Sequence, residues 1–140
     1  CTHALNQKVC SIIVRFGVKT HGEHAAAKSL SGGNLQKFIV GREIDANPSV
    51  LIVSQPTWGV DVGAQAQIHS ELLALRDAGC AILVVSEELE ELFALSDRLV
   101  VMAHGRLSPS VPTAQATVEQ LGAWMSGLWD ATTTPQEVLA

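Results

Sequence analysis

The segment "LSGGNLQK", residues 30 to 37, joins a helix-start signal to a pair of glycines. Ser31 stands where an N-cap would, because a helical pattern follows at once. Gly32 and Gly33 have no side chains, so backbone N–H groups there can approach a ligand closely. The positive end of the helix dipole faces the same spot. The segment predicts an anion site made of backbone and one hydroxyl, although Ser-Gly-Gly before a helix is also a common loop-to-helix turn.

Helix and strand patterns alternate along the chain. Apolar residues at helical spacing predict helices, and continuous apolar runs predict strands. The expected helices span residues 4–17, 32–47, 64–79, 87–96 and 118–129, the strands 50–53, 80–86 and 98–103, and the loops 18–29 and 108–117. His104 and Gly105 should turn the last strand into a hairpin, and a frayed tail should follow residue 129. Continuously apolar strands separated by helices indicate a parallel α/β sheet with buried strands.

Composition limits the function classes open to the chain. Its 140 residues suffice for at most one domain, and 47% of them are hydrophobic, so a real core can form. The formal net charge is −5, yet residues 1–49 carry six Lys/Arg and three Asp/Glu. That net +3 could favour an anionic ligand, the alternative being ordinary solvated helix faces. No apolar run reaches the roughly 20 residues of a membrane helix. The first ten residues do not resemble a secretory signal, and a chain that begins at Cys1 is expected to be a piece of a longer polypeptide.

The cysteines and histidines do not predict a metal site. Three cysteines, an odd count without a Cys-x-x-Cys pair, fit a reduced cytosolic protein. The candidate ligands have no spacing typical of a zinc finger or ribbon, and they are Cys1, His3, Cys10, His21 and His24. We therefore expect scattered surface histidines and core cysteines.

The order of the motifs resembles the ATP-binding cassette (ABC) family of transporter ATPases. After "LSGGNLQK" come a helix, an apolar strand, Pro56-Thr57, "GVD" at 59–61 and, further on, "LSDRLVVMAHGRL". The resemblance covers about residues 28–108. Within the family, "GGNLQK" and "SQPTWGVDVGA" look most like the ATPase subunits of nucleoside importers that work with basic-membrane-protein type binding proteins. Ribose and simple-sugar importers are close relatives. In both groups one polypeptide carries two cassettes, and this stretch looks like the second.

The resemblance implies a three-layer, P-loop NTPase-like parallel sheet of the α/β class, present here in part. Residues 1–49 would end the helical subdomain and carry the signature motif and its helix. Residues 50–108 would be the C-terminal part of the cassette core, and 109–140 a C-terminal loop and helix. The P-loop, Gly-x-x-x-x-Gly-Lys-Ser/Thr, does not occur in this sequence. In the family its strand lies well upstream of the signature.

The resemblance also implies roles for individual residues in a composite ATP site. Ser31, Gly32 and Gly33 would contact the γ-phosphate of an ATP held by the opposite cassette. Gln36 stands at the signature-helix position and Asp61 at the D-loop aspartate that communicates across the dimer. These five residues are the expected cofactor-binding set.

The positions that carry hydrolysis in the family depart from its pattern. Ser54 stands where the aspartate coupled to magnesium usually is, Gln55 at the catalytic glutamate, and Glu87 at the switch histidine. Gln55 cannot act as a base, and a carboxylate at position 87 would repel a phosphate. Trp58 replaces a residue that is often Arg. We therefore expect no catalytic residue and no metal ligand in this chain, and an isolated chain without activity.

The function implied is that of an ATP-binding part of a nucleoside or sugar importer. Its cofactors would be ATP and Mg²⁺, bound mainly by the partner cassette. Its partners would be the first cassette of the same polypeptide or a second copy, membrane permease subunits, and a periplasmic or lipoprotein solute-binding protein, with no nucleic acid. It would lie on the cytoplasmic face of the bacterial inner membrane as a peripheral protein. The alternatives are a non-transporter ABC protein and a small α/β interaction domain.

In the family's sheet, the P-loop strand lies between the strands at residues 81–85 and 99–102. Without it, each of these two strands would present an unpaired edge. We therefore expect the chain on its own to self-associate across these edges, or the two strands to pair directly.

Overall fold

The computed structural model describes residues 2–129, which form two compact units that meet between Glu87 and Glu88. The first unit contains α1 (Thr2–Arg15), the 3-10 turn η1 (Ala27–Ser29), α2 (Gly32–Asp45), β1 (Val50–Ser54), α3 (Val62–Asp77) and β2 (Ala81–Val85). The second contains α4 (Leu89–Leu95), β3 (Arg98–Leu99), β4 (Met102–Ala103), β5 (Arg106–Leu107), β6 (Val111–Pro112), η2 (Thr113–Gln115) and α5 (Val118–Met125). All five expected helices are present. α2 and α5 begin at the expected residues, and the other ends differ from the sequence patterns by one to four residues.

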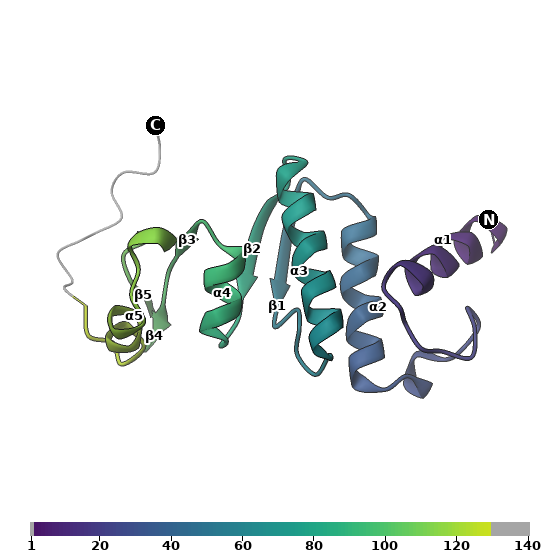
Figure 1. Cartoon of the computed structure of the whole chain (residues 1–140), viewed down its shortest axis with the longest axis horizontal. Helices are drawn as coiled ribbons and strands as arrows, with labels where there is room; N and C mark the ends of the chain where they lie inside the picture. Colours follow the sequence, from purple (N-terminus) through teal and green to yellow (C-terminus); the bar gives the residue numbers. More distant parts are fainter. Residues whose placement is uncertain (1, 130–140) are drawn as a thin grey trace. The chain divides into compact units, whose positions relative to one another are not determined.

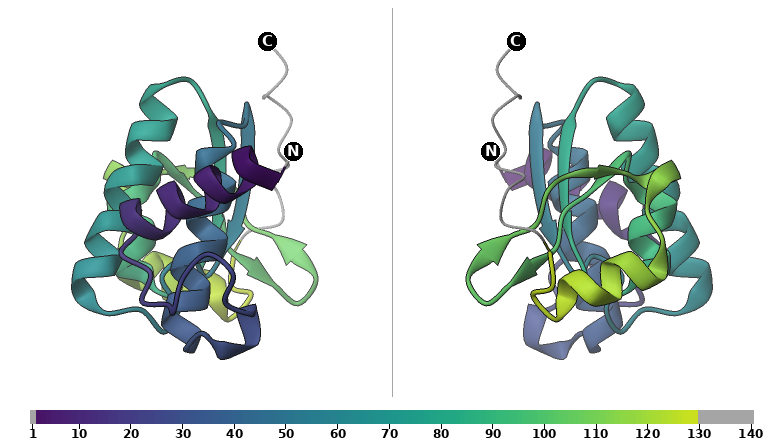
Figure 2. Two further views of the ribbon diagram at one scale, coloured as in Figure 1. Left: turned by 90° about the vertical axis from the view of Figure 1, so that its right-hand side faces the viewer. Right: turned by 90° about the vertical axis from the view of Figure 1, so that its left-hand side faces the viewer.

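The first unit is a two-layer α/β arrangement. Strands β1 and β2 are parallel, with Ile52 opposite Leu83 in register, and α3 connects them. Helices α2 and α3 pack on the strand pair, and α1 packs on α2 (Figures 1 and 2). This is the parallel α/β pattern expected from apolar strands alternating with helices.

The core of the first unit lies between this strand pair and its helices. Leu51 and Val53 of β1 point into it, and α3 contributes a buried stripe at helical spacing. The stripe consists of Ala64, Ile68, Leu72 and Leu75. Between α1 and α2, the Phe16 ring is 1% exposed and lies where a side chain on Gly41 would be, since a Cβ there would come within 2.5 Å of the ring.

The strands were expected to be buried, but among the described residues the helices cover them on one face only. Val50 and Ile52 of β1 are 62% and 68% exposed, and Leu83 and Val85 of β2 are 56% and 51% exposed. Burial alternates along β1 because neighbouring strand residues point to opposite faces and the helices cover only one of them.

The stretch 98–103 does not form a third parallel strand, as the sequence pattern predicted. It divides into β3, which pairs antiparallel with β6, and β4, which pairs antiparallel with β5 across the expected His104-Gly105 turn. Buried backbone N–H and C=O groups need hydrogen-bond partners. For β3 and β4 these partners come from segments nearby in the sequence, because closing a short loop costs little conformational entropy.

In the sheet of the first unit, β2 pairs with β1. Direct pairing of residues 81–85 with 99–102, or self-association of the chain, stays a prediction. The tail expected to fray after residue 129 lies outside the described residues.

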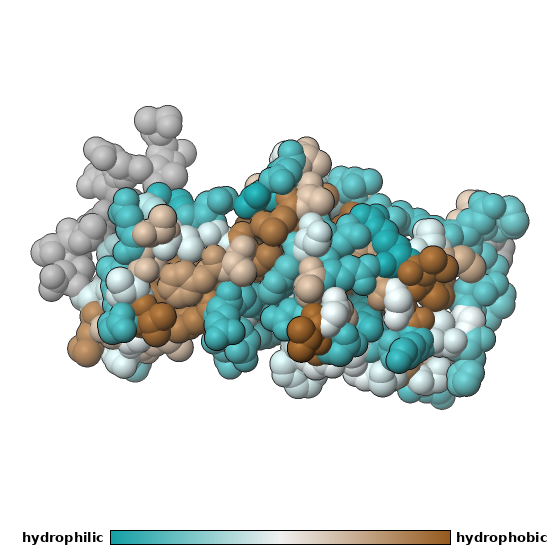
Figure 3. Space-filling view, in the orientation of Figure 1, coloured by the Kyte–Doolittle hydropathy of each residue, from teal (hydrophilic) through white to brown (hydrophobic). Residues whose placement is uncertain are grey.

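The second unit is small and exposes much apolar surface. Leu95, Leu99, Ala103 and Leu121 form its buried centre. Outside it, Met102, Leu107, Met125 and Leu128 are each more than half exposed, and apolar surface gathers over the β4–β5 hairpin and α5 (Figure 3). The boundary after Glu87 separates two compact units and is a different division from the three segments expected from the sequence. Those segments, 1–49, 50–108 and 109–140, remain a prediction.

Candidate functional site

The signature turn, residues 30–33, ends in a capped helix start. The Ser31 hydroxyl oxygen accepts hydrogen bonds from the backbone N–H of Asn34 at 3.5 Å and from its side-chain Nδ2 at 2.9 Å. The Asn34 Oδ1 in turn accepts from the backbone N–H of Lys19 at 2.8 Å. Ser31 is therefore the N-cap of α2, as its position in the sequence predicts. The cap fixes the turn without covering it, since Ser31 and Gly32 are both exposed.

The two glycines of the turn differ in what surrounds them. A Cβ on Gly32 would meet nothing within 4 Å, so its backbone is open to solvent. A Cβ on Gly33 would lie 2.6 Å from the carbonyl oxygen of Gly59. Gly33 thus permits a close backbone contact between α2 and the loop after β1, whereas Gly32 leaves room for a ligand.

Gln36 lies on the same face of α2, one turn further along. Its Nε2 donates to the carbonyl oxygen of Gln55 at 2.9 Å and to that of Pro56 at 3.1 Å. The side chain is half-buried and points at the loop that follows β1. Its hydrogen bonds join two elements of this chain.

Asp61 caps α3 and forms an ion pair with α2. Its Oδ1 accepts from the backbone N–H of Ala64 at 2.9 Å, and its Oδ2 lies 3.4 Å from Nζ of Lys37. The Ala64 hydrogen bond, followed by the hydrogen bond and charge of Lys37, lowers the pKa of Asp61 below its ordinary value. The carboxylate remains accessible, because 71% of the Asp61 side chain is exposed.

Ser54, Gln55 and Glu87 lie at the carboxyl ends of the two parallel strands. Ser54 is opposite Val85 in register, Gln55 follows β1 directly, and Glu87 follows β2 by two residues. Ligands of parallel sheets bind beyond this edge. Neither Ser54 nor Gln55 can carry a negative charge, so only Glu87 supplies a carboxylate at these three positions. Trp58, in the same loop, is 73% exposed.

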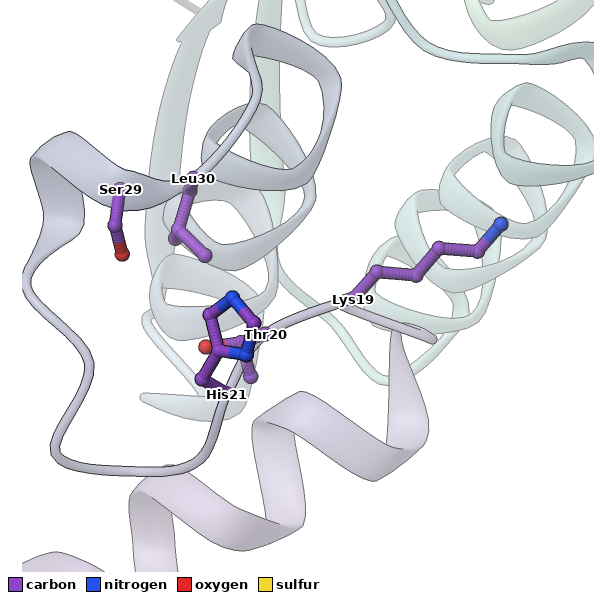
Figure 4. Close-up of a pocket in the computed structure, with 5 residues that line it drawn as sticks. All are labelled: Lys19, Thr20, His21, Ser29 and Leu30. Carbon is purple, nitrogen blue, oxygen red and sulfur yellow. The ribbon is translucent and has the colours of Figure 1, made fainter.

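An open cavity of about 260 Å³ adjoins the signature turn (Figure 4). Its lining residues are Lys19, Thr20, His21, Ser29 and Leu30. In the close-up, four of these side chains face a common space, while that of Lys19 points away. The hydroxyls of Thr20 and Ser29 donate to nearby backbone carbonyls, which leaves their oxygens able to accept hydrogen bonds from a ligand.

The sequence patterns missed three contributors to this site. Asn34 braces the Ser31 cap, Lys37 binds Asp61, and Pro56 presents a carbonyl to Gln36 while being almost wholly buried. For Lys37 the available signal was the helical spacing of positions 33, 36 and 37, which places them on one face of α2. Residues 3–129 contain no group of three or more His, Cys, Asp or Glu side chains arranged to hold a metal ion. Across the part of the chain that the structure describes, no helix has the length and apolar character needed to cross a membrane.

The chain is similar in sequence to ATP-binding proteins of bacterial importers. It is 49% identical over 121 residues to the guanosine import ATP-binding protein NupO of Bacillus subtilis. It is 46% identical over 123 residues to the nucleoside import ATP-binding protein NupA of Lactococcus lactis. A ribose import ATP-binding protein of Rhizobium etli, RbsA 2, is 40% identical over 117 residues. The matches cover 84–88% of this chain and 23–24% of each relative, so the chain spans about a quarter of the length of the curated relatives it matches. No protein-family model matches the chain.

Solved structures show the same fold. The ATP-binding subunit of an ABC transporter aligns with a TM-score of 0.73 at 16% identity, over 86% of this chain and 53% of that one. A dimeric ATP-binding cassette in a post-hydrolysis state, bound to ADP and phosphate, aligns with a TM-score of 0.67 at 18% identity, over 76% of this chain and 46% of that one.

The fold is thus that of part of an ATP-binding cassette, which confirms the partial α/β fold expected from the sequence. In sequence as well as fold, the chain corresponds to a part, about a quarter, of an ABC transporter ATP-binding protein, with nucleoside and ribose import proteins among its relatives.

Proposed function

We propose that the signature turn binds the terminal phosphate of an ATP molecule held by a partner cassette. The observation that carries the proposal is the open backbone at Gly32, next to the exposed hydroxyl of Ser31, at the start of a fourteen-residue helix. Such a start offers unpaired N–H groups and the positive end of the helix dipole to an anion. The adjoining cavity could receive more of the same nucleotide, because its walls carry hydroxyl oxygens and an imidazole.

Asp61 completes this proposal as the residue that faces the partner cassette. Its carboxylate is exposed, stays ionised over a wide pH range, and is held in place by the α3 cap. Pairing of two cassettes is supported by the solved cassette bound to ADP and phosphate, which has the same fold and is a dimer.

The chain's own hydrolytic positions would be degenerate. With Ser54 and Gln55 at the end of β1, the site lacks the acid that would couple to Mg²⁺ and the base that would activate water. ATP and Mg²⁺ would then be bound mainly by the partner cassette, and this chain would complete that site.

The transported solute is proposed to be a nucleoside, or otherwise a sugar such as ribose, because the similar import proteins are named for these solutes. The partners would be a first cassette, permease subunits and a solute-binding protein, at the cytoplasmic face of the bacterial inner membrane. A permease and an upstream P-loop cassette are required by this proposal.

The test is uptake and ATP hydrolysis by the assembled transporter carrying Ser31→Arg or Gly32→Leu. The first variant places a bulky cation at the turn, and the second fills the open space while keeping the Ser31 cap. Both should abolish uptake of a labelled nucleoside and stimulated ATP hydrolysis, while circular dichroism shows an intact fold. Ser11→Arg, on the exposed face of α1, is the matched control and should leave both activities near wild type. Normal uptake with either turn variant would show that the turn does not contact the nucleotide.

A further inference from the structure

Three residues on one face of α2 contact the loop of residues 55–61 at three points. Gly33 meets the carbonyl of Gly59, Gln36 donates to Gln55 and Pro56, and Lys37 pairs with Asp61. Positions 33, 36 and 37 have the i, i+3, i+4 spacing that places side chains on one helix face. The face that carries the signature turn at its start is therefore joined to the loop along a full helical turn.

Gln36 is the central and most specific of these contacts. A glutamine amide has two N–H donors, and both hydrogen bonds, at 2.9 and 3.1 Å, lie within the normal range for N–H···O. The acceptors are the carbonyl groups of two consecutive residues, so the amide fixes the direction of the loop backbone at that point. A leucine of similar size could not donate, and a glutamate would direct a carboxylate at two carbonyl oxygens.

The backbone that Gln36 holds is in a conformation that side chains disfavour. Gln55 has a φ of +50°, in the left-handed region that residues other than glycine rarely adopt. Two further hydrogen bonds hold Gln55 there, since its N–H donates to the carbonyl of Val85 at 2.7 Å and its carbonyl accepts from the N–H of Trp58 at 3.1 Å. Gln36 thus adds a side-chain restraint from α2 to a strained position at the end of β1.

We propose that Gln36 is a positioning residue that latches the signature turn to the loop of residues 55–61, so that a ligand at the turn and the conformation of the loop are coupled. The proposal rests on the proposed function for the identity of that ligand, the terminal phosphate of ATP. The latch itself rests on contacts within this chain. When phosphate orders the turn, the restraint passes through Gln36 to Gln55, and from there to Trp58 and Asp61 on the exposed side of the loop.

The latch is tested first in the 140-residue chain, by hydrogen exchange at the backbone N–H of Trp58. This N–H donates to the same carbonyl as Gln36 does, so it reports local opening of the loop. In Gln36→Leu and Gln36→Glu, exchange at Trp58 should be roughly tenfold faster, as expected for loss of partly buried hydrogen bonds. Exchange at Ile68 in the α3 core should change by much less. Gln7→Leu, which removes an exposed glutamine of α1, is the control and should leave Trp58 unaffected. Equal acceleration at Trp58 and Ile68 would reveal general destabilisation, and no acceleration would remove the latch; either result overturns the proposal.

The coupling is tested in the assembled ABC ATPase with the same variants. The Ser31 cap does not involve Gln36, so the KM for ATP should stay near wild type while kcat falls roughly tenfold, within the range of ordinary coupling free energies. A rise in KM without loss of kcat would mean that Gln36 only shapes the turn, and unchanged kinetics would mean that the latch has no effect on turnover; both oppose the proposal.

Ser31→Arg is measured alongside. If Ser31→Arg is inactive while the Gln36 variants are normal, the coupling is wrong and the proposed function stands. If Ser31→Arg is normal, the proposed function fails, and the exchange at Trp58 still decides whether the latch exists.

Discussion

Gly33 faces the backbone of Gly59 so closely that a Cβ atom at position 33 would come within 2.6 Å of the Gly59 carbonyl oxygen. The neighbouring Gly32 has no such contact. The two glycines of the signature turn therefore have separate tasks. Gly33 lets α2 approach the loop after β1, and Gly32 leaves the start of α2 open to a ligand.

This difference predicts unequal effects of alanine at the two positions. Gly33→Ala should lower the free energy of unfolding by about 1–3 kcal/mol, since the added methyl group forces the backbone contact apart. Gly32→Ala should change it by less than about 0.5 kcal/mol, because the site is open and exposed. Urea denaturation of the chain measures both. Equal losses in the two variants would contradict the contact with Gly59.

Gly41 and Phe16 offer a second test of packing, between α1 and α2. A Cβ on Gly41 would lie 2.5 Å from the Phe16 ring, so Gly41→Ala should destabilise by about 1–3 kcal/mol through overpacking. Phe16→Leu leaves a cavity and is also destabilising. Because the two sites touch, the double variant should lose less than the sum of the single losses. Strict additivity in the double-mutant cycle would show that the ring does not occupy this space.

Asp61 should give the unfolding free energy a measurable pH dependence. Its pKa is lowered first by the backbone N–H of Ala64 and then by Lys37, so its folded pKa lies below the ordinary value of about 3.9. The resulting stabilisation is complete above that ordinary value and is lost as the pH falls through the folded pKa. Asp61→Asn should therefore weaken the fall in urea midpoint between about pH 5 and about pH 2. Asp77→Asn, at the exposed end of α3, controls for removal of one surface carboxylate. Identical pH profiles for wild type and Asp61→Asn would contradict the lowered pKa of Asp61.

The 140-residue chain alone is expected to show no ATPase activity. The sequence contains no P-loop string, and neither Ser54 nor Gln55 can act as an acid or base. Restoring carboxylates with Ser54→Asp and Gln55→Glu should not produce turnover in this chain, because nothing in it would hold the nucleotide in the usual way. Phosphate release by the purified chain is the measurement. Turnover that disappears on mutation of Ser31 would overturn the expectation.

The exposed apolar face of the sheet in the first unit predicts that the chain self-associates. Val50, Ile52, Leu83 and Val85 are each more than half exposed on one face, beside a β2 edge to which the described residues add no strand. Such edges and faces favour association. Light scattering should show species larger than one chain, and Ile52→Lys with Leu83→Glu should shift them toward monomer. A wild-type chain that stays monomeric at high concentration would contradict self-association through this face.

Local sequence patterns were sufficient for much of the fold and part of the site. The periodicity of residues 4–17 predicted α1, and Gly17 ends that region with a φ of +58° because glycine adopts this conformation without strain. The serine before two glycines predicted the N-cap of α2, since capping depends only on residues three positions apart. The apolar runs predicted β1 and β2. These features depend on neighbours along the chain.

Features set by distant neighbours could be found only in the tertiary structure. Residues 99–103 form a continuous apolar run, as residues 50–53 of β1 do. They nevertheless divide between two short strands, because pairing depends on which segments lie within hydrogen-bonding distance. Both signature glycines look alike in the sequence, but only Gly33 lies against Gly59. In the sequence, Gln36 looks like any other polar residue of a helix. Only the structure shows that β1 ends in a left-handed turn, which brings two carbonyl groups to the Gln36 amide. Sequence determined where the capped turn and strands β1 and β2 begin, because those signals are local. Contact between α2 and the loop of residues 55–61 was decided by packing, which joins positions 19 to 26 residues apart.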